Sequence, residues 1–174
     1  MTNQQDENKT PIGIGMISIA WLLIMVVAAL WYQEWAEQQL NPNRKVSGSS
    51  NGISTSIKLA ANKQHQYIAK GQIGDVHGVF IVDTGATEVV VPQQLARRAN
   101  LAQGAPSKAM TANGLITVYS TIIPVMNIGP LEIREVEASI NPAMQGSGIL
   151  LGMSALKDME IVHSNGILTI TQMQ

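Results

Sequence analysis

The chain has 174 residues with 11 basic and 12 acidic side chains, and its formal net charge of −1 provides no basic surface of the kind that binds nucleic acid. It contains no cysteine, which excludes disulfide bonds, thiolate nucleophiles and cysteine-based zinc sites. Residues 57–174 are enough for one ordinary domain and too few for two.

Residues 12–32 form an apolar run in which Ser18 is the only clearly polar side chain. Because about 20 apolar residues are needed to cross a bilayer, the run predicts a transmembrane helix after a short tail at 1–11. Trp31 and Tyr32 lie at its far end, where aromatic rings favour the headgroup region. The alternatives are a cleaved signal peptide, which would have a basic leader and a shorter core, and a buried helix of a soluble protein.

Residues 33–56 are polar and rich in turn-forming residues. They contain Asn41-Pro42-Asn43 and then a stretch at 47–52 made of serine, glycine and asparagine. This composition predicts a flexible linker between the transmembrane helix and the domain.

The remainder, 57–174, alternates short β-type runs with turn signals, which predicts a mainly β domain with a compact, closed fold. Pro92 starts a short helix that ends near Leu101, and a second short helix is expected over 153–157. Asn113-Gly114 is the strongest hairpin signal. The expected strands are 67–73, 79–83, 89–91, 107–111, 115–123, 125–128, 131–140, 159–162 and 167–171.

One acid stands out by its position. Phe80-Ile81-Val82 is an apolar β-type run that ends in Asp83 and is followed at once by the small, turn-forming Thr84-Gly85-Ala86. A second apolar run, Ile149-Leu150-Leu151-Gly152, ends in glycine far downstream. The pattern predicts a strand that delivers a carboxylate into a tight turn.

In this order and within one domain, Asp83-Thr84-Gly85-Ala86, the Asn113-Gly114 hairpin and the run 149–152 resemble the motifs of retropepsin-like aspartic proteases. The best match is the bacterial branch, in which such a domain follows a single membrane anchor. The resemblance covers about residue 57 to the end of the chain. It implies a closed acid-protease β-barrel and an aspartic endopeptidase that hydrolyses polypeptides without a metal or cofactor.

The resemblance also implies a place in the cell and an assembly. The chain would cross the bacterial inner membrane once, with its catalytic domain in the periplasm; the charges that flank the apolar run do not decide this orientation. Only Asp83 occupies a catalytic position, since Asp6, Asp75 and Asp158 fall in a tail, a turn and a helix. The second carboxylate must therefore come from another copy, which predicts a two-fold symmetric homodimer.

Roles for the neighbouring residues follow from the same resemblance. Thr84 would bond across to the partner's loop, Gly85 would let the backbone approach the carboxylates, and Ala86 would leave room for substrate. The hairpin over 110–118 would close over the substrate as a flap; the alternative is an ordinary solvent-exposed hairpin. The flap tip would be formed by Ala112, Asn113 and Gly114, and the active-site loop would be supported by Ile149, Leu150, Leu151 and Gly152.

Two residues depart from the retroviral pattern. Retroviral members usually carry Asp directly after the first motif and Arg directly after the glycine of the second, whereas this chain has Thr87 and Met153. Losing both members of an ion pair can be neutral, while losing one leaves an unpaired charge. Catalysis therefore stays possible, but dimers would be stabilised differently.

Other polar residues have simpler interpretations. Glu88 is expected to face solvent, and Ser147 and Ser154 lack the context of a catalytic serine. The histidines are dispersed without metal-ligand spacing: His65, His77 and His163. Asp83 itself could be a structural turn residue. The alternative function is then a catalytically inactive module of the same fold that binds peptides or mediates assembly.

Overall fold

The computed structural model describes residues 12–111 and 114–173. The chain forms two compact units, one that ends at Gln38 and one over Gln39–Gln174. The first unit contains most of helix α1 (Ile12–Leu40), which is long and apolar enough to cross a membrane. Large apolar side chains along α1, such as Leu22 and Ile24, are exposed.

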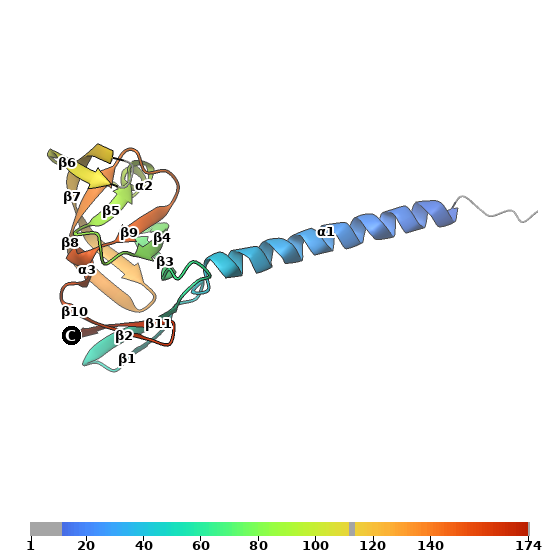
Figure 1. Cartoon of the computed structure of the whole chain (residues 1–174), viewed down its shortest axis with the longest axis horizontal. Coiled ribbons are helices and arrows are strands. Elements are labelled where there is room, and N and C mark those ends of the chain that lie inside the picture. Colours follow the sequence, from blue (N-terminus) through green and yellow to red (C-terminus); the bar gives the residue numbers. More distant parts are fainter. Residues whose placement is uncertain (1–11, 112–113, 174) are drawn as a thin grey trace, which may run out of the picture. The chain divides into compact units, whose positions relative to one another are not determined.

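The second unit contains two β-sheets (Figure 1). The smaller sheet has four antiparallel strands in the order β1-β2-β11-β10. Its strands are β1 (Ser47–Ser50), β2 (Ser54–Ala60), β10 (Met159–Ser164) and β11 (Ile167–Met173).

The larger sheet has seven strands in the order β3-β4-β9-β5-β8-β7-β6. Because β3 also pairs with β7, six of these strands close into a barrel and β6 stays outside it. The strands are β3 (Ile68–Ile73), β4 (Val76–Val82), β5 (Val89–Pro92), β6 (Pro106–Thr111), β7 (Gly114–Ile128), β8 (Leu131–Asn141) and β9 (Gly148–Leu151). The prediction of a mainly β, closed-barrel fold is confirmed.

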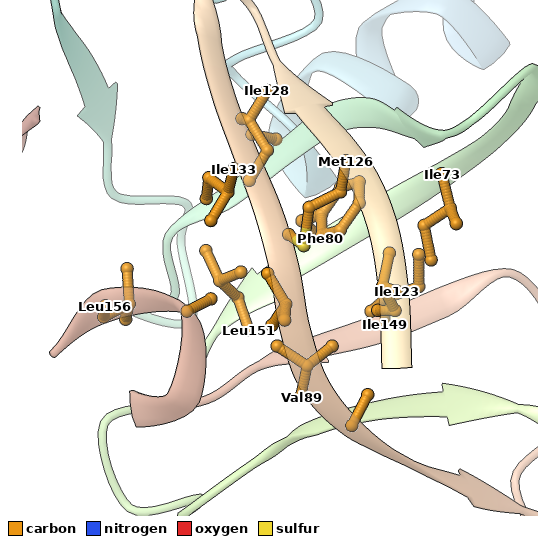
Figure 2. Close-up of a cluster of buried hydrophobic side chains, with 14 of the residues drawn as sticks. Ile73, Phe80, Val89, Ile123, Met126, Ile128, Ile133, Ile149, Leu151 and Leu156 are labelled. Carbon is orange, nitrogen blue, oxygen red and sulfur yellow. The ribbon is translucent and has the colours of Figure 1, made fainter. Parts of the chain in front are cut away.

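The core is built from alternate residues of these strands. Phe80, the only phenylalanine of the chain, is fully buried, and burial of a side chain of this size stabilises the fold by about 2–3 kcal/mol. Figure 2 shows Phe80 among core side chains from several strands, together with Leu156 of α3 (Met153–Leu156). The other short helix, α2 (Gln93–Arg98), follows Pro92 as predicted and buries Leu95 and Ala96.

The order of three central strands places the candidate site. Strand β9 lies between β4 and β5, parallel to β4 and antiparallel to β5. The loop 83–88 that joins β4 to β5 must therefore pass the end of β9. This topology brings Asp83 next to Leu151 although the two residues are far apart in the sequence.

The structure differs from the predicted linker over 33–56. Helix α1 continues to Leu40, and Ser47–Ser50 pairs along its full length with β2. The composition was misleading because all four residues of β1 are exposed, which leaves no apolar alternation to reveal an edge strand. Residues 39–56 are thus part of the folded domain, and residues 33–38 continue α1.

The structure also joins two strands that the sequence predicted separately, 115–123 and 125–128. Strand β7 runs through Pro124, which has no N–H to donate and is skipped in the pairing with β8. Glu135, in the matching gap on β8, has a φ of 51°. An exposed proline at an unpaired position does not end the strand.

Candidate active site

Backbone hydrogen bonds hold Asp83 at the end of β4. Its N–H donates to the Leu151 carbonyl at 3.1 Å, and its own carbonyl accepts from the Ala86 N–H at 3.2 Å. Its carboxylate atom Oδ1 accepts from the Gly85 N–H at 3.0 Å. The side chain is half-buried, so one carboxylate oxygen is oriented by the loop while the group stays accessible.

The end of strand β9 packs against this loop. Ile149 and Leu151 are buried in the core, whereas Leu150 points to the other face. Gly152 follows at the point of closest approach: a Cβ placed there would lie 2.5 Å from the Glu88 carbonyl carbon and 2.8 Å from the Ala86 oxygen. Only glycine lets β9 end against the loop at this distance.

The start of α3 fixes the far half of the loop. The Met153 N–H donates to the Ala86 carbonyl and the Ser154 N–H to the Thr87 carbonyl, both at 2.9 Å. The Ser154 hydroxyl donates to the Glu137 carbonyl at 2.7 Å and accepts from the buried Val89 N–H at 3.0 Å. Ser154 therefore ties the loop and β5 to β8.

Asp83 borders a groove of about 650 Å³. One wall is formed by the loop and by Val90 and Leu150, and the other by the β6–β7 hairpin with Met110 and Ile116. The strand residues that line the groove are both apolar and polar, the polar ones including Lys108, Ser139 and Asn141. Two carboxylates border the groove, those of Asp83 and Glu88, and among the described residues only Asp83 is held by a hydrogen bond to the loop backbone that joins β4 to β5. A groove of mixed character around an oriented carboxylate suits an extended peptide, which offers both backbone hydrogen-bonding groups and apolar side chains.

A second hollow of about 620 Å³ lies beside β3 and β4, with Lys70, His77 and Asn127 among its lining residues. It contains no carboxylate side chain. Within residues 12–111 and 114–173, no group of three or more His, Asp or Glu side chains is placed to hold a metal ion. The Asp83 groove is the stronger candidate.

A sequence model of the family described as "gag-polyprotein putative aspartyl protease" matches residues 69–158, just over half of the chain. The chain belongs to this family of retropepsin-like aspartic proteases. The match includes the Asp83 loop, the β6–β7 hairpin and the run 149–152.

Solved structures agree with this assignment at the level of the fold. The crystal structure of a retropepsin-like aspartic protease from Rickettsia conorii matches with a TM-score of 0.56 and 19% sequence identity. The match covers 74% of this chain and 94% of the other. No curated protein matches the sequence.

The structure of this retropepsin-like chain brings most of the predicted site residues together. Asp83, Gly85, Ala86 and Leu150 all border the groove. Gly114, on the hairpin, has a φ of 104°, which favours glycine. Two of the predicted flap residues, Ala112 and Asn113, lie outside the described residues.

Other predicted residues hold supporting or peripheral positions. Thr84 is exposed beside the groove-lining residues, and Glu88 is exposed at the groove edge. Thr87 and Met153 stand where retroviral members carry a charge pair. Here the Thr87 carbonyl accepts from the Ser154 N–H, and the Met153 N–H donates to the Ala86 carbonyl. Hydrogen bonds of the main chain thus connect the two motifs at this point.

Sequence reasoning missed the contribution of Ser154. Its two partners are 17 and 65 residues away in the chain, so no local spacing indicates the contact. The available signal was a serine in the first turn after Gly152, where hydroxyl groups often bond to the backbone.

Proposed function

We propose that this chain is a membrane-anchored aspartic endopeptidase in which Asp83 residues from two copies form the catalytic pair. The observation that carries the proposal is the groove: the oriented, half-buried carboxylate of Asp83 borders it together with Val90, Leu150 and the β6–β7 hairpin. A single chain supplies one of the two carboxylates that this chemistry needs, and the two-fold dimer supplies the other.

The pair would act as acid and base together. Two carboxylates about 3 Å apart cannot both be ionised, so they share one proton. The ionised member takes a proton from water as the water oxygen attacks the peptide carbonyl carbon, while the protonated member donates to the carbonyl oxygen. The pair then donates the proton taken from water to the amide nitrogen as the C–N bond breaks, and one hydroxyl of the tetrahedral intermediate gives its proton back to the pair as the new carboxyl group forms.

The loop contacts support this assignment. The Gly85 N–H holds Oδ1 before substrate arrives, and such preorganisation lowers the cost of reaching the transition state. Thr84 is exposed, and in the proposed dimer its hydroxyl bonds to the partner's loop. Ala86 borders the groove with a side chain small enough to leave room for substrate.

The proposed dimer needs a different interface from one built on the charge pair, because Thr87 and Met153 carry no charge. Strands β2 and β11 pair with each other inside one chain, from Ser54 to Ala60, so these paired edges are not free to join a sheet with the partner. Anchoring of both copies in one membrane raises their effective concentration, so a modest interface would suffice.

The β6–β7 hairpin would serve as the flap. It forms one wall of the groove, and Met110 on it is 79% exposed, available to pack on a bound peptide. Closure would exclude water from the carboxylate pair. Strand β6 is at the end of the larger sheet and offers a free edge for an extended polypeptide.

The proposed location is the bacterial inner membrane, with α1 as a single span and the domain in the periplasm. The length and apolar character of α1 support the span. Protease protection of the domain in intact cells and in spheroplasts tests the orientation, since a periplasmic domain is degraded only after the outer membrane is opened.

The function is tested by measuring cleavage of unstructured polypeptides by the full-length protein and by Asp83→Asn. We expect the variant to lose cleavage, because an amide cannot serve as the base. Asp75→Asn, in the exposed β3–β4 turn, is the matched control and should keep full activity. Cleavage that persists in Asp83→Asn would exclude this mechanism; peptide binding without cleavage by the wild type would favour the inactive module.

A further inference from the structure

The polar segment after α1 is fixed to the domain by a buried asparagine. Asn43 is only 6% exposed, and its amide nitrogen donates to the Ala60 carbonyl at 2.9 Å and to the Ile68 carbonyl at 2.8 Å. Its amide oxygen accepts from the Ala60 N–H at 2.7 Å. Asn43 thus joins the end of β2 to the start of β3, and the chain cannot move freely at this point.

A second buried asparagine fixes the chain one turn earlier. Asn62 is 7% exposed, and its amide nitrogen donates to the carbonyl of Leu40, the last residue of α1. Its amide oxygen accepts from the Gln64 and Gln66 N–H groups, both at 2.9 Å. The folded domain therefore begins at Leu40 rather than after a free linker.

The length of chain between the apolar run and the domain is consequently short. Tyr32 ends the apolar run, and eight residues lead from it to Leu40. At about 3.5 Å per residue these span at most about 28 Å. A domain of this size is about 40 Å across. Chain length alone then keeps the groove within about 70 Å of the membrane surface, whereas a free linker over 33–56 would reach well beyond that distance.

We propose that the substrates are polypeptide segments close to the membrane surface, such as the juxtamembrane segments of membrane-anchored proteins, and that Asn43 and Asn62 enforce this choice by limiting reach. This inference rests on the proposed protease function. The groove binds an extended backbone. The short tether, residues 33–40, limits how far from the membrane surface that backbone can lie. Sites held far above the bilayer are excluded by distance rather than by sequence.

The test uses the full-length protein in lipid vesicles with anchored substrates on the same side. The probe is a peptide that the full-length protein cleaves in solution, selected from a library of unstructured peptides. It is carried on a rigid two-stranded coiled coil anchored through both chains, at about 20 Å or about 90 Å above the bilayer, set by 1.5 Å per residue. We expect cleavage at the near position and at least about tenfold slower cleavage at the far one.

Two insertion variants make the result specific to the tether. A 60-residue Gly/Ser insertion between Tyr32 and Gln33 adds about 40 Å of average reach and should bring the two rates within about threefold of each other. The same insertion in the exposed β1–β2 turn, after Gly52, falls inside the loops that the Asn43–Ala60 and Asn62–Leu40 hydrogen bonds close, so it adds no reach and should leave the far site protected. All variants should cleave the soluble peptide equally.

The outcomes separate the two proposals. Equal cleavage of near and far sites by the wild type, with normal cleavage of the soluble peptide, would overturn the tether inference and leave the protease intact. Absence of cleavage of any soluble peptide would overturn the protease function, and the tether inference with it.

Discussion

Gly152 directly follows β9, and replacing it by alanine should damage the active site more than the same replacement of Gly148 at the start of β9. The backbone at Gly152 has φ of −86° and ψ of −178°, which alanine adopts without strain. The obstacle is space, because the added Cβ would meet the carbonyl groups of Glu88 and Ala86 in the active-site loop.

The size of the effect follows from these contacts. A carbon normally lies about 3.5 Å or more from another carbon, and the Cβ would lie 2.5 Å from the Glu88 carbonyl carbon. Backbone must therefore move by about 1 Å. Overpacking of this kind costs about 1–3 kcal/mol of unfolding free energy, and a 1 Å displacement of a catalytic loop costs about 100-fold in rate.

Gly148→Ala is the matched control. It lies at the start of β9, and its added Cβ would have Ile81 Cδ1 as its nearest neighbour, at an ordinary 3.6 Å. Urea unfolding and cleavage of a soluble peptide measure both variants. We expect Gly148→Ala to differ from wild type by less than about 1 kcal/mol and to stay active. Equal stability and activity of the two variants would refute the claim that Gly152 sets the loop position.

Three further predictions concern the polar contacts. Ser154→Ala should lose about 1–3 kcal/mol in urea unfolding and slow cleavage, because a buried N–H loses its acceptor, whereas the exposed Ser147→Ala should change neither. Asn43→Ala should lose at least about 2 kcal/mol in the same assay, while Asn51→Ala in an exposed turn should lose less than about 1. Thr121→Val should raise the melting temperature, since its buried hydroxyl has no hydrogen-bond partner among the described residues; an unchanged or lower value would show that the hydroxyl is satisfied.

Much of the fold was predictable because local signals agree with the final topology. Phe80 lies in an apolar β-type run that forms β4, Pro92 precedes a helix, and the strands on either side of the Asn113-Gly114 signal do pair. The motif order also predicted that the turn after Asp83 and the run that ends in Gly152 would meet. Their contact depends on β9 lying between β4 and β5, which the resemblance implied and local periodicity alone does not.

Several unpredicted features depend on contacts between distant residues. Asn43 looked like part of a linker because its partners, Ala60 and Ile68, are 17 and 25 residues away. Ser154 lacked any local motif for the same reason. Strand β1 has no apolar residue and forms only because β2 offers it a backbone partner. Composition alone predicts that such segments are flexible, because the contacts that order them come from residues that are distant in the sequence.

The central claim, that two copies share one catalytic pair, is tested most directly by mixing subunits. Wild-type protein and differently tagged Asp83→Asn protein are co-refolded in equal amounts, and co-purification of the tags confirms that mixed dimers form. If both carboxylates are needed, random pairing leaves one active dimer in about four, and activity per total protein falls to about a quarter of that of the wild type. Activity of about a half would mean that each chain works alone and would contradict the shared site.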